Sequence, residues 1–290
     1  MPAALPSSYK YVGPKDSTLS LKWHFLCLTL GLPYVTQHSL YGQTITSFLT
    51  QVMEALLSNK SCFLAEDAWK EVIRSVIHSD DSLSDHKDLA IALWGHLVNG
   101  PGRFKEVTDA ISSATPPSQS EIDGIIRRLQ FDRDRLLGWL TMAGTLPDLQ
   151  GIQPEADQYG FMFPRHLCKT NPNHNSRLAL WGTYVMCRIL KSRLLVAMAP
   201  RRFSTLEVEC QHLVSRIMSL RQMTSTGEGL VDTLFVSQST WMAGGILATR
   251  DSWSEKHLNA GDGMIDRRRF HEWCVSIGRV CPGLNEEMPV

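Results

Sequence analysis

Apolar residues recur every three or four positions through most of this chain, which is the spacing of one face of an α-helix. The pattern predicts helices over residues 41–57, 64–77, 83–98, 103–114, 176–199, 204–223, 230–248 and 266–279. Alternation of apolar and polar residues, the mark of a strand, is nearly absent. We therefore expect an all-α fold, a single multi-helix domain over residues 19–290.

Proline, glycine and serine mark the predicted helix ends. Asn99-Gly-Pro-Gly102 should stop the helix before it, because proline cannot extend a helix and glycine frees the backbone. Thr115-Pro-Pro-Ser118 is a second break. Ser118 or Ser120 then suits the N-cap of a further helix that runs to about Ala143, with Glu121 and Asp123 in its first turn.

Two segments fall outside this helical pattern. Residues 1–18 carry several prolines and glycines and are predicted to form an irregular N-terminal arm. Residues 144–175 are the longest irregular stretch and hold four prolines and three glycines. A loop of this length is often functional, but it could equally join two helical lobes, residues 19–143 and 176–290.

Charge and cysteine content exclude several classes of protein. Lys plus Arg equals Asp plus Glu at 29 each, so the basic balance typical of nucleic-acid binding is missing. We interpret Arg267-Arg268-Arg269 as a solvated face or helix end, and the charged residues between Arg127 and Arg135 as a solvated face. The seven cysteines are odd in number and none forms a C-x-x-C pair, which favours a reduced compartment over a disulfide framework.

No segment is expected to insert into a membrane. The apolar run at residues 25–35 is too short to span a bilayer, and Pro33 interrupts it. It lacks an obvious cleavage pattern, so we also reject a secretory signal. The sequence predicts a soluble, cytoplasmic protein.

Motifs for cofactor and metal chemistry are missing or incomplete. There is no nucleophile elbow, no phosphate-binding loop and no zinc-protease motif. Asp80, Asp81 and Asp85 are similar to the aspartate-rich motif of class I terpene cyclases, but their spacing is one residue too long and a second metal motif is not found. These residues make a better helix start, so we expect neither a metal nor an organic cofactor.

The segment from Leu178 to Leu195 is the most informative stretch. At helical spacing Trp181, Tyr184 and Arg188 form one stripe, an aromatic surface with a cation beside it. Arg177, Lys191 and Arg193 are expected to reach water. Such a stripe suits an organic ligand, and it equally suits an ordinary core helix.

Aromatic residues and histidines elsewhere could complete an apolar pocket with a few placed polar groups. The candidate catalytic residues are Arg188, Tyr184 and His166. The candidate substrate-binding residues are Trp181, Trp241, Met242, Tyr159, Phe161, Phe163, Trp94 and His96. The competing interpretation is that the tryptophans are plain core and that the histidines are surface or satisfied groups.

Three stretches of the C-terminal half carry a family resemblance. They are the helix with Tyr184 and Arg188-Ile189, the apolar segment 234–248 that ends in small residues, and the arginine-started segment 267–279. Together they resemble the α-helical regulatory domain of fungal zinc-cluster transcription factors. That family's DNA-binding motif needs six closely spaced cysteines, whereas residues 1–60 hold only Cys27. The resemblance therefore implies a helical shell for a small organic molecule and no nucleic-acid partner.

Two functions follow as hypotheses. By analogy with helical proteins of fungal natural-product pathways, the first is a cofactor-independent cyclase, such as a hetero-Diels–Alderase that joins a polyene or terpene to a tropolone quinone methide. The alternative is a non-enzymatic regulatory module that binds a small molecule. A metal-dependent terpene cyclase is a third hypothesis that rests only on the three aspartates. The expected partner is a small apolar organic molecule. Whether the chain also forms a homodimer is left open.

Overall fold

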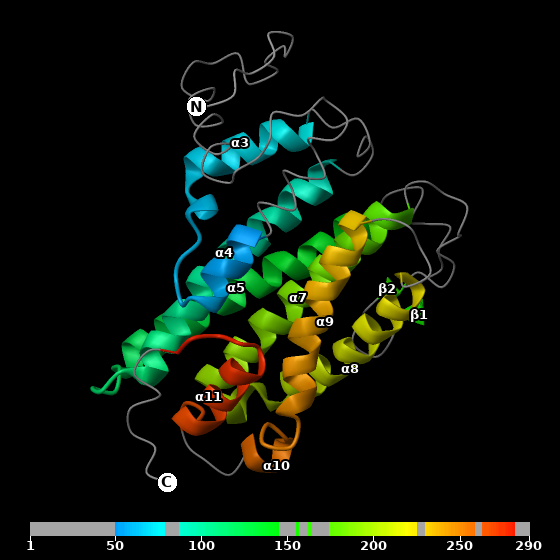
Figure 1. Ribbon diagram of the computed structural model, residues 1–290. Coiled ribbons are helices and arrows are strands. Elements are labelled where there is room, and N and C mark those ends of the chain that lie inside the picture. The colour runs from blue at the N-terminus through cyan, green and yellow to red at the C-terminus, as the bar shows by residue number, and fades with distance from the viewer. Residues whose placement is uncertain are drawn as a thin grey trace, which may run out of the picture.

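The computed structural model describes residues 50–78, 87–144, 155–156, 162–163, 174–224, 230–258 and 263–281 (Figure 1). Residues 50–57 are helical and lead to a 3-10 turn, η1 (Phe63–Ala65). The α-helices that follow are α3 (Asp67–His78), α4 (Lys87–Ser112), α5 (Gln119–Gly144), α7 (His174–Met198), α8 (Pro200–Thr224), α9 (Leu230–Ala248), α10 (Glu255–Leu258) and α11 (Arg267–Ser276). The predicted all-α fold is confirmed for these residues, while the N-terminal arm at 1–18 lies outside them.

The segment predicted to be irregular contains two very short strands. β1 (Glu155–Ala156) pairs antiparallel with β2 (Met162–Phe163), with Glu155 opposite Phe163. Apart from these strands and the flanking ends of α5 and α7, the segment 144–175 lies outside the described residues.

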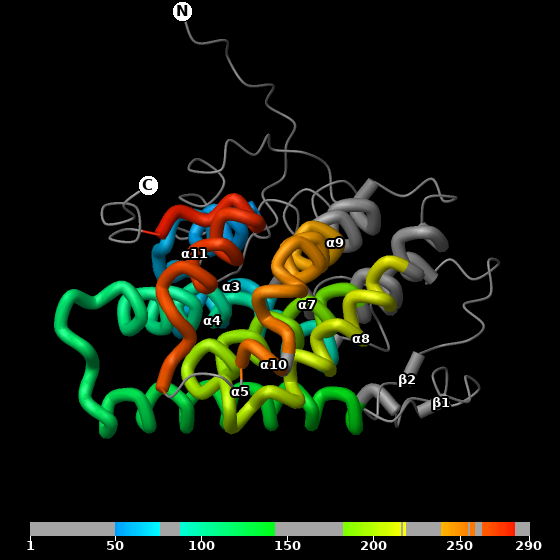
Figure 2. The backbone as a smooth tube through the Cα atoms, turned by 90° about the horizontal axis from the view of Figure 1, so that it is seen from below, coloured from blue at the N-terminus to red at the C-terminus, as the bar shows by residue number. Residues whose placement is uncertain are grey.

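Helix α7 lies at the centre of the molecule. It packs against α4 and α5 on one side and against α8 and α9 on the other. Figure 2 shows α5 along one edge and α9 and α11 on the opposite side, with α4 and α7 between them. Helices from both sides of residues 144–175 therefore contribute to one hydrophobic core, which extends from Val52 to Cys281.

The helix stop predicted at Asn99-Gly-Pro-Gly102 is wrong. Helix α4 continues through Pro101 to Ser112. Proline inside a helix costs about 3 kcal/mol, but the buried apolar face continues on both sides of it, through Leu97 and Val98 to Phe104 and Val107. Burying four such side chains outweighs that cost.

Gly100 adds a packing reason for the continuous helix. A Cβ at this position would lie 3.1 Å from Cδ2 of Leu190 on α7. The missing side chain lets the two helix backbones approach closely at this crossing. The glycine that suggested a helix end therefore serves a helix contact.

The break between α4 and α5 matches its prediction. The backbone N–H and the hydroxyl of Ser118 both donate to Oε2 of Glu121, at 2.7 Å each, and the Glu121 N–H donates to Ser118 Oγ at 3.3 Å. This reciprocal arrangement is a capping box. Ser118 is thus confirmed as the residue that caps α5.

The C-terminal helix closes the end of the core. Asp266 caps α11 by accepting a hydrogen bond from the Arg269 N–H at 2.9 Å. Arg267 begins the helix and donates to the carbonyl oxygens of Ile111 and Ser113 at the end of α4. The basic run is therefore a helix start, as predicted, and its first arginine joins two distant helices. Among the described residues, no helix combines the length and apolar character needed to cross a bilayer.

Candidate functional site

The central helix carries cations in the protein interior. Every residue of α7 from 182 to 198 is buried, including Arg188, Lys191 and Arg193. The prediction that Lys191 and Arg193 reach water is wrong, because neighbouring helices cover α7 on all sides. Apolar residues nevertheless occur on every side of α7, which is typical of a core helix, and that signal was present in the sequence.

Arg188 belongs to a buried ionic network that joins three helices. Its Nε donates to Oε1 of Glu209 on α8 at 2.7 Å, and Arg133 of α5 donates to Oε2 of the same carboxylate at 2.7 Å. Burial opposes the charge of Arg188, but contacts with Tyr184 and Glu209 outweigh it and raise the pKa of the guanidinium. Both carboxylate oxygens are engaged, so the network is a cross-link between α5, α7 and α8.

Arg133 and Asp132 correct a second sequence prediction. These residues were assigned to a solvated face, yet the Asp132 carboxylate is largely buried and accepts from Arg103 of α4 at 2.7 Å. Arg133 points to Glu209 and also donates to Ser192 Oγ at 3.2 Å. Helix α5 packs against both α4 and α7, so charges near its middle meet partners on both neighbours.

Tyr184 is packed within this region. Its hydroxyl accepts from Nη1 of Arg188 at 3.1 Å, and burial raises the pKa of the phenol. Its ring stacks on Trp139 with centroids 5.1 Å apart and planes 20° apart. Trp139, which sequence reasoning missed as a site neighbour, donates its indole N–H to the Leu89 carbonyl. The described surroundings of Tyr184 are therefore filled by protein groups.

Arg193 makes mainly aromatic contacts. Its guanidinium carbon lies 3.9 Å from the ring centre of Trp253 and 5.1 Å from that of Trp273. The carboxylate of Glu207 lies 3.4 Å from Nε without hydrogen-bond geometry. Burial lowers the pKa of Arg193 to about 10. This cluster fastens the C-terminal part of the chain to α7.

A small enclosed cavity lies beside the third buried cation, and we call it the Lys191 cavity. Its lining comes from four helices: Val52, Met53 and Leu56 of segment 50–57; His96, Leu97 and Gly100 of α4; Met186, Cys187, Leu190 and Lys191 of α7; and Met242 of α9. Its volume is about 10 Å³, room for one water-sized sphere. The walls are almost entirely apolar.

Lys191 is poorly compensated in this cavity. Its Nζ has a single hydrogen bond among the described residues, to the His96 carbonyl at 3.5 Å, and no carboxylate in that set lies within ion-pair distance. Burial lowers the pKa of the ammonium group, while Cys187 and Asp132 act against this shift. Burial of this kind disfavours the charged form of an amine.

His96 and Cys187 are the other ionisable groups at the cavity. Burial, followed by the charge of Lys191, lowers the pKa of His96 to about 4, so its imidazole is neutral at pH 7. Burial raises the pKa of the Cys187 thiol to about 11. The cavity therefore presents a neutral base, a thiol and an amine that is costly to protonate.

The structure brings together some of the predicted site residues. His96 and Met242 line the Lys191 cavity, and the half-buried Trp241 packs against the core next to Met242. Trp94 is buried on α4, two residues before His96. Tyr184 and Arg188 belong to the ionic network instead.

Other predicted residues cannot be placed. His166, Tyr159 and Phe161 lie outside the described residues. Phe163 is in β2 and Trp181 is on α7, and their side chains also lie outside what is described.

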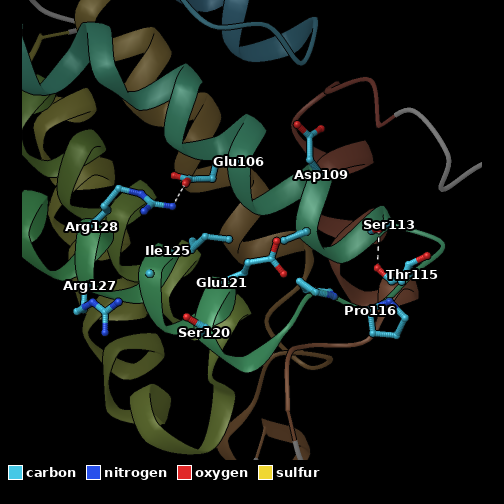
Figure 3. A pocket seen from close by; sticks show the side chains of 13 residues that line it. Glu106, Asp109, Ser113, Thr115, Pro116, Ser120, Glu121, Ile125, Arg127 and Arg128 are labelled. Atoms are coloured by element: carbon cyan, nitrogen blue, oxygen red, sulfur yellow. Dashed lines mark hydrogen bonds and ion pairs between the residues drawn. The ribbon is translucent and has the colours of Figure 1, made fainter.

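A second, open hollow on the described surface is a groove of about 730 Å³ between α4 and α5, near their connecting turn (Figure 3). Arg128 pairs with Glu106, and Glu121 accepts hydrogen bonds from Ser118, while Arg127 also lines the groove. Asp109 pairs with Lys105 beside it. An open groove lined by charged residues does not enclose an apolar molecule.

Metal-binding clusters and known relatives do not supply a further site. The described residues contain no group of three or more His, Cys, Asp or Glu side chains placed to hold a metal ion, and Asp80, Asp81 and Asp85 lie outside them. Comparisons of the chain with protein-family models, curated proteins and solved structures find no match.

Proposed function

We propose that this chain is a binding module that takes a small, mostly apolar organic molecule into the Lys191 cavity. The observation that carries the proposal is Lys191 itself, a buried amine without a carboxylate partner among the described residues, facing apolar walls. A buried charge without a partner costs folding free energy. Residues of this kind cluster at functional sites, where a polar group must meet a ligand.

The walls of the cavity suit a guest that is larger than the closed space. A volume of about 10 Å³ is far below the roughly 300–1,000 Å³ of a typical ligand pocket. Three of the lining residues are methionines, Met53, Met186 and Met242. Methionine has a flexible, polarisable side chain that repacks around different shapes, so the cavity can enlarge by rotamer changes.

Methyl NMR tests this proposal on the intact chain. With methyl-labelled methionine, titration with benzene should produce saturable shifts of Met53, Met186 and Met242. Met198 is the internal control, because it is buried on the same helix and does not line the cavity. The exposed Met142 reports surface binding. Unchanged cavity methyls, or shifts that follow Met142, would refute the proposal.

A cofactor-independent cyclase is a second candidate, and one observation favours it. His96 and Lys191 line the same apolar cavity, so a base and an amine face the same bound molecule. The neutral imidazole could move a proton, a contribution typically worth about 10²–10⁴-fold in rate. Positioning of the reacting carbons would supply more.

Incubation with polyene and tropolone-type precursors, with and without EDTA, separates the two candidates. The cyclase predicts product formation that survives the chelator and falls in His96→Gln. Binding without conversion supports the binding module. Conversion that EDTA abolishes points instead to the metal-dependent hypothesis.

A further inference from the structure

We propose that Lys191 attaches the ligand covalently, and that the natural ligand class is therefore small apolar aldehydes. This inference rests on the proposed function, since it assigns the chemistry by which the same cavity holds its guest. Three features carry it: the position of the amine, the absence of a carboxylate partner among the described residues, and the apolar walls.

The position of the amine comes first. Lys191 lies at the inner face of α7, where only a small part of its surface meets solvent. Nζ reaches the His96 carbonyl at 3.5 Å, a long and weak hydrogen bond that leaves most of the donor capacity of an ammonium group unused. A neutral amine needs fewer acceptors and has a lone pair for bonding.

Burial, and not the surrounding charges, is what favours the neutral form of Lys191, because the charges around it act in both directions. Arg103 of α4 and Arg135 of α5 repel a second positive charge, while Asp132 of α5 and Cys187 of α7 act in the opposite sense. Burial is the largest influence and lowers the pKa of Lys191. Desolvation in an apolar site is a known way to make a lysine nucleophilic.

The reaction needs no further reagent. The Nζ lone pair attacks the aldehyde carbon, and the carbonyl π electrons move to oxygen. A proton then passes from nitrogen to that oxygen, which gives a carbinolamine. The hydroxyl then takes up a proton and leaves as water with the C–O electron pair while the nitrogen lone pair forms the C=N bond. The remaining N–H proton is released in return, so no net proton is consumed and the product is a neutral imine.

The cavity also explains why an aldehyde should be small and apolar. The lining beyond Lys191 and His96 offers hydrocarbon, thioether and thiol surface, which cannot hydrogen-bond a polar chain. Apolar walls slow the return of water to the C=N carbon, since hydrolysis requires water at that atom. Neutral His96, next to the amine on the cavity wall, can pass protons during dehydration.

Reductive trapping tests the inference on the full chain. The protein is incubated at pH 7 with limiting butanal and sodium cyanoborohydride, and butylated lysines are located by peptide mass spectrometry. Lys105 is the internal reference, because it lies on α4 with an exposed side chain paired to Asp109. We expect butylation of Lys191 to exceed that of Lys105 by at least about tenfold, since an ordinary lysine is almost fully protonated at this pH.

Benzene links the labelling to the cavity and separates the two proposals. It should protect Lys191 from butylation in the wild-type chain and leave Lys105 unaffected. Labelling of Lys191 no greater than that of Lys105, or labelling that benzene does not reduce, overturns covalent attachment. If benzene still shifts the cavity methionines in that case, the binding proposal stands alone; if it does not, both proposals fail.

Discussion

Nε of Arg188 on α7 lies 2.7 Å from Oε1 of Glu209 on α8, with both side chains almost fully buried. The same carboxylate binds Arg133 of α5, so one glutamate holds two helices. This geometry makes Arg188 a structural residue. A catalytic role would instead predict loss of activity with unchanged stability.

Arg188→Ala should therefore destabilise the fold by about 3–5 kcal/mol, because it leaves the buried Glu209 with only part of its compensation. Denaturant unfolding followed by circular dichroism measures the change. Lys105→Ala, which breaks the exposed pair with Asp109, is the matched control and should have little effect. An Arg188→Ala variant that is as stable as the wild type would contradict the structural role.

Lys191→Met should have the opposite effect and stabilise the protein by about 1 kcal/mol or more at pH 7, because it replaces a buried amine, whose protonation burial opposes, by an apolar side chain of similar length. Lys105→Met, at an exposed site, should change little. The same denaturant measurement applies. A less stable Lys191→Met variant would show that the ammonium group is well solvated or paired.

The benefit of Lys191→Met should shrink as the pH rises. Burial lowers the folded-state pKa of Lys191, so between that value and the ordinary value of about 10.4 the unfolded chain binds the additional proton. The stability of the wild type therefore rises with pH in that window, whereas the variant lacks the pH dependence that Lys191 contributes. A difference between the two proteins that stays constant from neutral pH to about pH 10.5 would rule out a lowered pKa.

His96 predicts a second pH dependence, at acid pH. Its folded-state pKa of about 4 lies below the unfolded value of about 6.5, so the unfolded chain takes up the proton first as the pH falls. The stabilisation is fully present above about pH 6.5 and is lost on the way to about pH 4. Melting temperatures measured across this range should therefore show the wild type losing stability relative to His96→Gln as the pH falls.

Two adjacent glycines of α9 provide a matched pair. A Cβ at Gly245 would lie 2.2 Å from Cγ2 of Ile277, whereas a Cβ at Gly244 meets nothing within 4 Å. We expect Gly245→Ala to lose about 1–3 kcal/mol through overpacking against the end of α11. Gly244→Ala should gain about 0.5–1 kcal/mol from better helix propensity. Thermal unfolding of both variants checks the contrast, and equal melting temperatures would contradict the close contact.

Local chemistry in the sequence predicted much of the fold. Helix α9 has the predicted bounds, Leu230–Ala248, and the capping box at Ser118 was visible as serine before an acidic turn. Both features depend on residues near one another in the chain. The predicted helix end near Pro101 was wrong because it considered only the local cost of a proline. The burial that outweighs this cost involves α7, which is distant in the sequence.

The candidate site was harder to predict because it depends on contacts between distant segments. His96 and Met242 were chosen for their chemical type, and the structure places both on one cavity. Lys191 was assigned to solvent because lysine is rarely buried. Its burial follows from the apolar residues on every side of α7, which place the whole helix inside the protein.

The central position of α7 also constrains the order of synthesis and assembly. Helices α4 and α5 leave the ribosome first, and the apolar faces that they turn toward α7 stay uncovered until residues 174–198 follow. A nascent chain that pauses before this point would expose Leu93, Leu97 and Leu136. Exposed apolar surface of this kind binds chaperones or other incompletely folded chains. Pausing of translation in this region should therefore lower the yield of native protein more than pausing after α8.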